Sequence, residues 1–181
     1  MDTNSDIQND TLKVAPFDHA AIQRIAIITD AWFPQINGVV RVLDSVRKEL
    51  VALGHSVQMI TPDAFRTVPC PSYPEIPLAL FPGRKMSKIL NEAQPTAIHI
   101  ATEGPLGLTA RWWCLRRNVP FTTAYHTKFP EYVHVRTHLP LSWLYRVVRW
   151  FHGPSSKVLA PSPSVYRELT AHGFRNAKEW A

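Results

Sequence analysis

The sequence is poor in cysteine and glycine. Its 181 residues include only two cysteines, Cys70 and Cys114, and seven glycines. The cysteine spacing matches no metal-binding or redox motif, and two isolated cysteines favour a reducing compartment. Gly38 is the only glycine between Arg24 and Leu53, whereas the dinucleotide fingerprint Gly-x-Gly-x-x-Gly needs three. The sequence therefore argues against a nicotinamide-dependent dehydrogenase.

Long apolar runs and nucleic-acid motifs are also missing. No stretch approaches the roughly 18 apolar residues that cross a bilayer, and no RNP, helix-turn-helix or zinc-finger pattern is present. The segment Met1–Asp10 is polar and acidic, without the basic start and apolar run of a secretory signal. We therefore expect residues 1–22 to form a disordered polar tail, the protein to be cytoplasmic, and nucleic acid not to be a partner.

What remains is a basic chain with enough apolar residues for a real core. Hydrophobic residues make up 45% of the sequence, which suits one compact domain over residues 23–178. The net charge is +6, and residues 1–20, with four aspartates and Lys13, contribute −3 to it, which leaves +9 on the rest. Such a balance suits nucleotide phosphates or anionic lipid head groups.

After Arg24 the pattern alternates between strands and helices. Short apolar runs predict strands, and apolar residues three and four apart predict helices. The expected strands are Ile25–Thr29, Ser56–Thr61, Leu78–Phe81, Ala97–Ala101, Phe121–Tyr125 and Lys157–Ala160. One expected helix begins after Gly38. The others span Met86–Ala93, Leu106–Arg117, Leu141–His152 and Ser164–His172. The five prolines at positions 62–77 predict an irregular loop. The alternation predicts an α/β fold: a Rossmann-like, doubly wound, mostly parallel sheet with helices on both faces.

The first strand-to-helix junction is the most informative segment. Val39, Leu43, Val46 and Leu50 mark one apolar face of a helix. Gly38, at its start, would let a ligand approach the backbone closely, and a helix N-terminus favours an anion such as a diphosphate. The alternative is that this glycine is needed only to start the helix.

Three segments carry a resemblance to a known family: Asn37-Gly38-Val39, Thr102-Glu-Gly-Pro-Leu-Gly107 and Thr122-Thr-Ala-Tyr-His-Thr127. With these motifs in order, residues 23–178 resemble the N-terminal domain of a GT-B-fold, retaining glycosyltransferase of family 4. The likeness is greatest to bacterial GDP-mannose-dependent mannosyltransferases and glycolipid glycosyltransferases.

The resemblance implies an activity and several site residues. A retaining hexosyltransferase of this kind moves a sugar from a nucleoside-diphosphate sugar, here GDP-mannose or a UDP-sugar, to a hydroxyl of a lipid or glycan. Asn37, Gly38 and Val39 would bind the donor diphosphate, and His126 would be the catalytic residue at the donor sugar. No bound cofactor or metal is implied. The family's C-terminal donor-binding domain is absent from this chain, so we expect the isolated 181 residues to be inactive or weakly active.

Further candidates bind the acceptor or sugar, because loops after parallel strands meet at one sheet edge. They are Asp30, Trp32, Glu103, Tyr125 and Thr127. Alternatives stay open for several of them: Glu103 suits a helix cap, Trp32 suits packing of its loop against the core, and His126 suits a structural hydrogen bond.

Two other patterns have open interpretations. His134 and His138 share a helical spacing, but no third metal ligand accompanies them. The segments Arg111–Arg117 and Trp143–Trp150 mix arginine with tryptophan, which suits either buried helices or peripheral contact with the inner face of the membrane. The rival function is a non-catalytic, truncated or split module that binds an acceptor glycan, a lipid or a partner domain.

Overall fold

The structure is a computed structural model that describes residues 21–70, 73–126 and 129–180. Most of the tail predicted over residues 1–22 lies outside the described residues, as does Thr127 of the predicted acceptor site.

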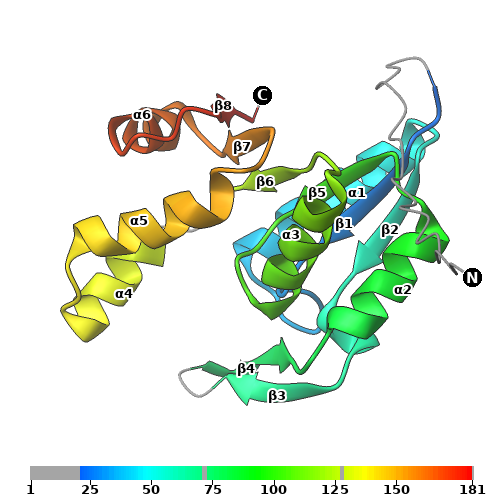
Figure 1. Ribbon diagram of the computed structural model, residues 1–181, viewed down its shortest axis with the longest axis horizontal. Coiled ribbons are helices and arrows are strands. Elements are labelled where there is room, and N and C mark those ends of the chain that lie inside the picture. The colour runs from blue at the N-terminus through cyan, green and yellow to red at the C-terminus, as the bar shows by residue number, and fades with distance from the viewer. Residues whose placement is uncertain (1–20, 71–72, 127–128, 181) are drawn as a thin grey trace, which may run out of the picture.

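Within the described residues, six parallel strands form one sheet in the order β2-β1-β5-β6-β7-β8 (Figure 1). The strands are β1 Arg24–Ile28, β2 Ser56–Ile60, β5 Ala97–Ile100, β6 Thr122–Ala124, β7 Lys157–Ala160 and β8 Ala177–Glu179. The helices are α1 Gly38–Ala52, α2 Gly83–Ala93, α3 Pro105–Arg117, α4 Phe129–Thr137, α5 Leu141–His152 and α6 Pro163–Ala171. The predicted α/β class and parallel sheet are confirmed.

Both faces of the sheet are covered, because successive side chains of a strand point to opposite faces. Ile28 and Ile100 pack with Met86 of α2 and Trp113 of α3 on one face. Ile27 packs with Leu43 of α1 on the other. In Figure 1, α2 and α3 lie in front of the sheet and α1 behind it. Burial on both faces explains the unbroken apolar run of β1.

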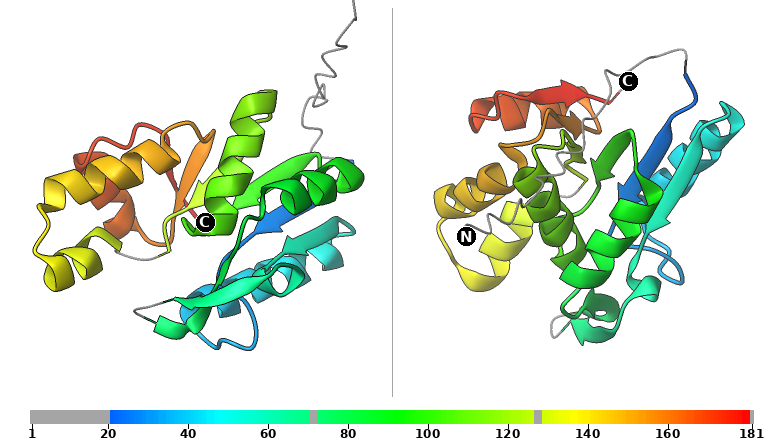
Figure 2. Two further views of the ribbon diagram at one scale, coloured as in Figure 1. Left: turned by 60° about the horizontal axis from the view of Figure 1, so that its bottom comes forward. Right: turned by 45° about the vertical axis from the view of Figure 1, so that its right-hand side comes forward.

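Helices α4, α5 and α6 gather at the β7–β8 end of the sheet (Figure 2). A second apolar cluster, which includes Tyr145, Val148, Val158, Leu169 and Phe174, joins α5 and α6 to these strands. Neither α4 nor β8 was predicted. Strand β8 is three residues long with two of them exposed, so no alternation of apolar residues marks it.

The prediction for residues 62–81 was wrong in part. This segment holds a 3₁₀ turn, Pro62–Ala64, and an antiparallel hairpin of β3 Thr67–Cys70 and β4 Tyr73–Ala79. The hairpin lies apart from the main sheet (Figure 2), so it is not the irregular loop plus sheet strand that the prolines suggested. Pro69 pairs with Pro77 in its register. A two-stranded ribbon tolerates proline because each strand has one unpaired edge.

The strand order fixes where a ligand site forms. From β1 the chain proceeds through α1 to β2 on one side, and later returns to β5 on the other side of β1. The loops after β1 and β5 thus diverge at the carboxyl end of the sheet, where open α/β sheets bind ligands.

Candidate active site

Asp30 and Thr102 join the ends of β1 and β5. The Asp30 backbone N–H donates to Thr102 Oγ1 at 2.7 Å, and this hydroxyl donates to Asp30 Oδ2 at 2.8 Å. The same carboxylate accepts the backbone N–H groups of Leu106 at 2.8 Å and Gly107 at 3.3 Å. Burial raises the pKa of Asp30, although these hydrogen bonds oppose the rise. Asp30, predicted to bind the acceptor, is placed as a carboxylate at the N-terminus of α3.

The glycines of the 102–107 motif make room for this contact. A Cβ at Gly104 would lie 2.4 Å from Asp30 Cγ, and a Cβ at Gly107 would lie 1.9 Å from the Thr102 carbonyl oxygen. Both distances are far below van der Waals contact. The motif is therefore explained by close packing of the β5–α3 turn against Asp30.

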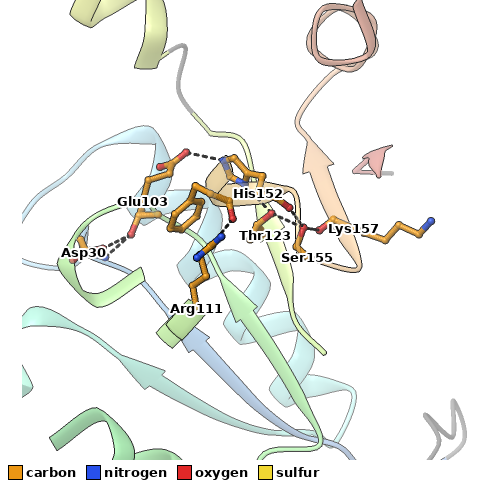
Figure 3. A network of polar contacts seen from close by, with 9 residues as sticks. Asp30, Glu103, Arg111, Thr123, His152, Ser155 and Lys157 are labelled. Carbon is orange, nitrogen blue, oxygen red and sulfur yellow. Dashed lines mark hydrogen bonds and ion pairs between the residues drawn. The ribbon is translucent and has the colours of Figure 1, made fainter. Parts of the chain in front are cut away.

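Glu103 faces a histidine that sequence analysis missed. Its Oε1 lies 3.1 Å from Nε2 of His152, the last residue of α5 (Figure 3). The His152 side chain is 1% exposed and that of Glu103 is 28% exposed. A buried imidazole thus holds a half-buried carboxylate. His152 ends a predicted helix, but no local signal linked it to Glu103.

His152 is itself fixed from the core side. Its Nδ1 lies 2.8 Å from Thr123 Oγ1 of β6, and that hydroxyl donates to Ser155 Oγ at 3.2 Å. The Asn176 amide donates to Ser155 Oγ at 3.1 Å. We call Glu103, His152, Thr123, Ser155 and Asn176 the inner polar chain (Figure 3 draws its first four members). It runs from the core to the sheet edge, and it fixes the rotamer of Glu103.

His126, the predicted catalytic residue, follows β6. Its ring lies 5.5 Å from that of Trp180, and its buried Nε2 has no hydrogen-bond partner in the described part of the chain. Burial lowers the pKa of His126, which Glu103 partly opposes. The imidazole borders an open pocket of about 400 Å³ that is lined by Arg41, Val42, Ser45, Val46, His126, Pro161 and Trp180. An unpaired ring nitrogen beside this pocket is available to a ligand.

The predicted diphosphate residues lie at the start of α1, whose later residues Arg41–Val46 contribute to the wall of that pocket. Asn37 Oδ1 accepts the Val40 N–H at 3.0 Å and so caps α1. Gly38 is exposed, and a Cβ there would meet nothing within 4 Å. Val39 packs partly into the core. The first N–H groups of a helix have no partner within it, so α1 presents donors to an open space.

The two predicted aromatic residues pack inward. The Trp32 ring meets that of Phe33 edge-on at 5.2 Å and packs against the cluster of Ile27 and Leu43. Tyr125 is 1% exposed and makes edge contacts with His152 and Phe174. Both side chains therefore pack with the apolar clusters beneath the site loops.

His134 and His138 do not combine into a metal centre. His134 Nδ1 lies 2.7 Å from the Leu139 carbonyl oxygen, so this ring nitrogen is occupied. No group of three His, Cys, Asp or Glu side chains in the described ranges is arranged to hold a metal ion. Likewise, none of the helices within those ranges is both long and apolar enough to cross a membrane.

This Rossmann-like sheet, with its site at the strand ends, is the architecture of the N-terminal half of a GT-B glycosyltransferase. The chain belongs to glycosyltransferase family 4, whose sequence profile matches residues 36–178.

Individual relatives agree with this assignment. A GDP-mannose-dependent alpha-mannosyltransferase of Corynebacterium glutamicum is 26% identical over 178 residues, which cover 87% of this chain and 42% of that protein. The protein of the same name from Mycobacterium tuberculosis is 25% identical over 181 residues, and the match covers 87% of this chain and 47% of that protein. An alpha-monoglucosyldiacylglycerol synthase of Streptococcus pneumoniae is 29% identical over 124 residues, and the match covers 61% of this chain and 28% of that protein. The chain thus spans less than half the length of these relatives.

Proposed function

We propose that this chain is the acceptor-side domain of a retaining glycosyltransferase. The enzyme would transfer a sugar, with mannose favoured, from a nucleoside-diphosphate sugar to a hydroxyl of a lipid or glycan. The observation that carries this proposal is the pocket between α1 and His126. Its walls come from His126 and from α1, the helix that begins at the exposed Gly38. The His126 Nε2 has no hydrogen-bond partner among the described residues. GDP-mannose is favoured because two relatives are named as GDP-mannose-dependent enzymes.

The geometry suggests a division of labour. The backbone N–H groups of Gly38 and Val39, with the positive end of α1, would hold the diphosphate. His126 Nε2 would hydrogen-bond the donor sugar at the reacting centre. Burial lowers the pKa of this imidazole and so favours its neutral form, in which Nε2 can donate or accept one hydrogen bond. Recognition of the nucleotide base would come from a second domain of the kind that the longer relatives have room for.

A second candidate function is a non-catalytic binding module. Its support is the apolar surface of α3 and α5, where Trp112, Trp143 and Trp150 are each more than half exposed. Such a surface suits a lipid or a partner domain.

A titration of the chain with GDP-mannose and with a UDP-sugar, followed by ¹⁵N NMR, tests the site. We expect shifts at the amides of Gly38, Val39 and Val40 and at the His126 ring. The anomeric configuration of the product, read from its NMR coupling after reaction of the enzyme that carries this domain, tests retention. An inverted product would refute the proposed mechanism. Lipid binding with no response to any sugar nucleotide would favour the binding module.

A further inference from the structure

Trp180 follows β8 and reaches two histidines that come from other parts of the sheet. Its backbone N–H donates to the Ala160 carbonyl oxygen at 2.8 Å, which extends the pairing of β7 with β8 by one residue. The centre of its partly buried ring lies 5.5 Å from that of the His126 ring and 5.9 Å from that of the His99 ring. One indole thus contacts an imidazole of β5 and an imidazole from the loop after β6.

His126 differs from its neighbouring histidines in how its ring is held. Nδ1 of His99 lies 2.9 Å from the Thr122 hydroxyl oxygen of β6. Nδ1 of His152 lies 2.8 Å from the Thr123 hydroxyl oxygen of the same strand. Within the described residues we find no hydrogen bond to the His126 ring, and its buried Nε2 has no partner there. Since a histidine ring is usually oriented by a hydrogen bond at one nitrogen, the orientation of His126 depends on packing.

Trp180 provides that packing at the edge of the candidate active site. The two rings are tilted by 52° to each other, and both line the open pocket that α1 also borders. A contact between two aromatic rings at this distance is favourable and restricts rotation of the imidazole about its χ2 bond. Burial lowers the pKa of both His99 and His126, and the indole, which contacts both rings, contributes to that burial.

We propose that Trp180 is a positioning residue of the candidate active site, which fixes the orientation of the His126 ring beside the pocket. It acts through His126 and makes no bond to the sugar donor. The observation that carries this inference is the contact of one indole with an imidazole that no hydrogen bond holds in the described chain. The inference rests on the proposed function, because it names the residue that orients His126 for that function.

Steady-state kinetics of the proposed glycosyltransferase separates positioning from binding. Trp180→Ala should lower kcat about tenfold, because an imidazole that rotates freely is seldom in the productive orientation. The donor KM should change less than about twofold. Trp180→Phe keeps an aromatic ring and should restore kcat to within about threefold of the wild type. Trp143→Ala is the matched control, since Trp143 is more than half exposed on α5 and does not line the pocket.

Two outcomes would overturn the positioning role. A higher donor KM in Trp180→Ala with an unchanged kcat would make Trp180 a wall of the pocket that binds the donor directly. Equal losses of kcat in the Ala and Phe variants would show that the aromatic contact does not orient His126. Rates are compared per folded protein, which the dispersed amide signals of a ¹⁵N spectrum measure for each variant.

A pH titration of the histidine rings by NMR gives a second readout, on the 181-residue chain without any sugar donor. Trp180→Ala exposes the His126 ring to water, so its pKa should rise toward the ordinary 6.5. The pKa of His99 should rise from about 4 for the same reason. Glu103, whose charge also acts on His126, is present in every variant. Trp180→Phe and Trp143→Ala should leave both pKa values near those of the wild type. An unchanged pKa of His126 in Trp180→Ala would refute the proposal.

The two proposals fail separately. The expected titration together with no sugar transfer by the wild-type enzyme would refute the proposed function, while the contact of Trp180 with His126 would stand. Sugar transfer by the wild type with an unchanged kcat in Trp180→Ala would refute the positioning role alone.

Discussion

Asp30 and Gly104 are in such close contact that a methyl group at position 104 would lie 2.4 Å from the carboxyl carbon of Asp30. The two residues are more than seventy positions apart and come from the loops after β1 and β5. The carboxylate is held there by the Leu106 and Gly107 backbone N–H groups. The contact thus fixes the turn after β5, and Glu103 next to it takes its direction from this turn.

Gly104→Ala should therefore disturb the turn. We expect the free energy of unfolding to fall by about 1–3 kcal/mol, because the added methyl group displaces Asp30 or its hydrogen bonds. Urea denaturation measures this loss. Gly83→Ala is the control, since a Cβ at Gly83 meets nothing within 4 Å. A Gly104→Ala protein as stable as the Gly83→Ala protein would show that the turn adapts without cost.

Asn37→Ala should destabilise the protein by about 1 kcal/mol, because it removes the side-chain cap of α1. Asn37→Ser, which can still cap, should restore most of the stability. If the side chain also binds the donor diphosphate, Asn37→Ser should weaken GDP-mannose binding while stability is retained. Unchanged donor affinity in the Ser variant would leave Asn37 with the capping role alone, and calorimetric titration distinguishes the two outcomes.

The sequence predicted the helices and strands whose apolar residues recur at a regular spacing or whose ends are marked by a residue such as glycine. Helix α1 was predicted from its apolar face. In the structure it begins at Gly38, as expected, and the left-handed Gly54 (φ +87°) follows its end. The β3–β4 hairpin was misjudged because proline usually argues against strands, yet here two prolines face each other in an isolated ribbon. Strand β8 has no apolar pattern, since its place depends on pairing with β7.

The candidate site was predictable only as a set of loops. The sheet topology brings the ends of β1, β5 and β6 to one edge, so the Asp30, Glu103 and His126 loops were correctly expected to converge. What sequence cannot give is the direction of each side chain. Asp30 turns to α3, and Glu103 meets His152, which is 49 residues away. Such partnerships depend on tertiary packing, and no local spacing encodes them.

Stability should depend on pH through His99. Burial lowers the pKa of His99 to about 4 from its ordinary 6.5, with His126 contributing. Between these values the unfolded chain binds a proton that the folded chain does not, so the free energy of unfolding should fall as the pH drops from 6.5 toward 4. His99→Gln should reduce this slope, as measured by urea denaturation between pH 4.5 and 7.5. His126 titrates in the same direction, so part of the slope should remain. An unchanged slope in the variant would mean that His99 is protonated equally in both states.

The role of His126 can be separated from its contribution to folding. In the proposed glycosyltransferase, His126→Ala should lower kcat/KM for sugar transfer by about 10²–10³-fold. The cost in stability should be less than about 2 kcal/mol, because the ring is only partly buried and its Nε2 makes no hydrogen bond in the described chain. His138→Asn is the control, since His138 is exposed and its left-handed backbone (φ +56°) suits asparagine. This variant should retain activity. A His126→Ala enzyme that loses activity only in proportion to its loss of folded protein would make His126 a structural residue. The pocket beside α1 would then need another group at the donor sugar.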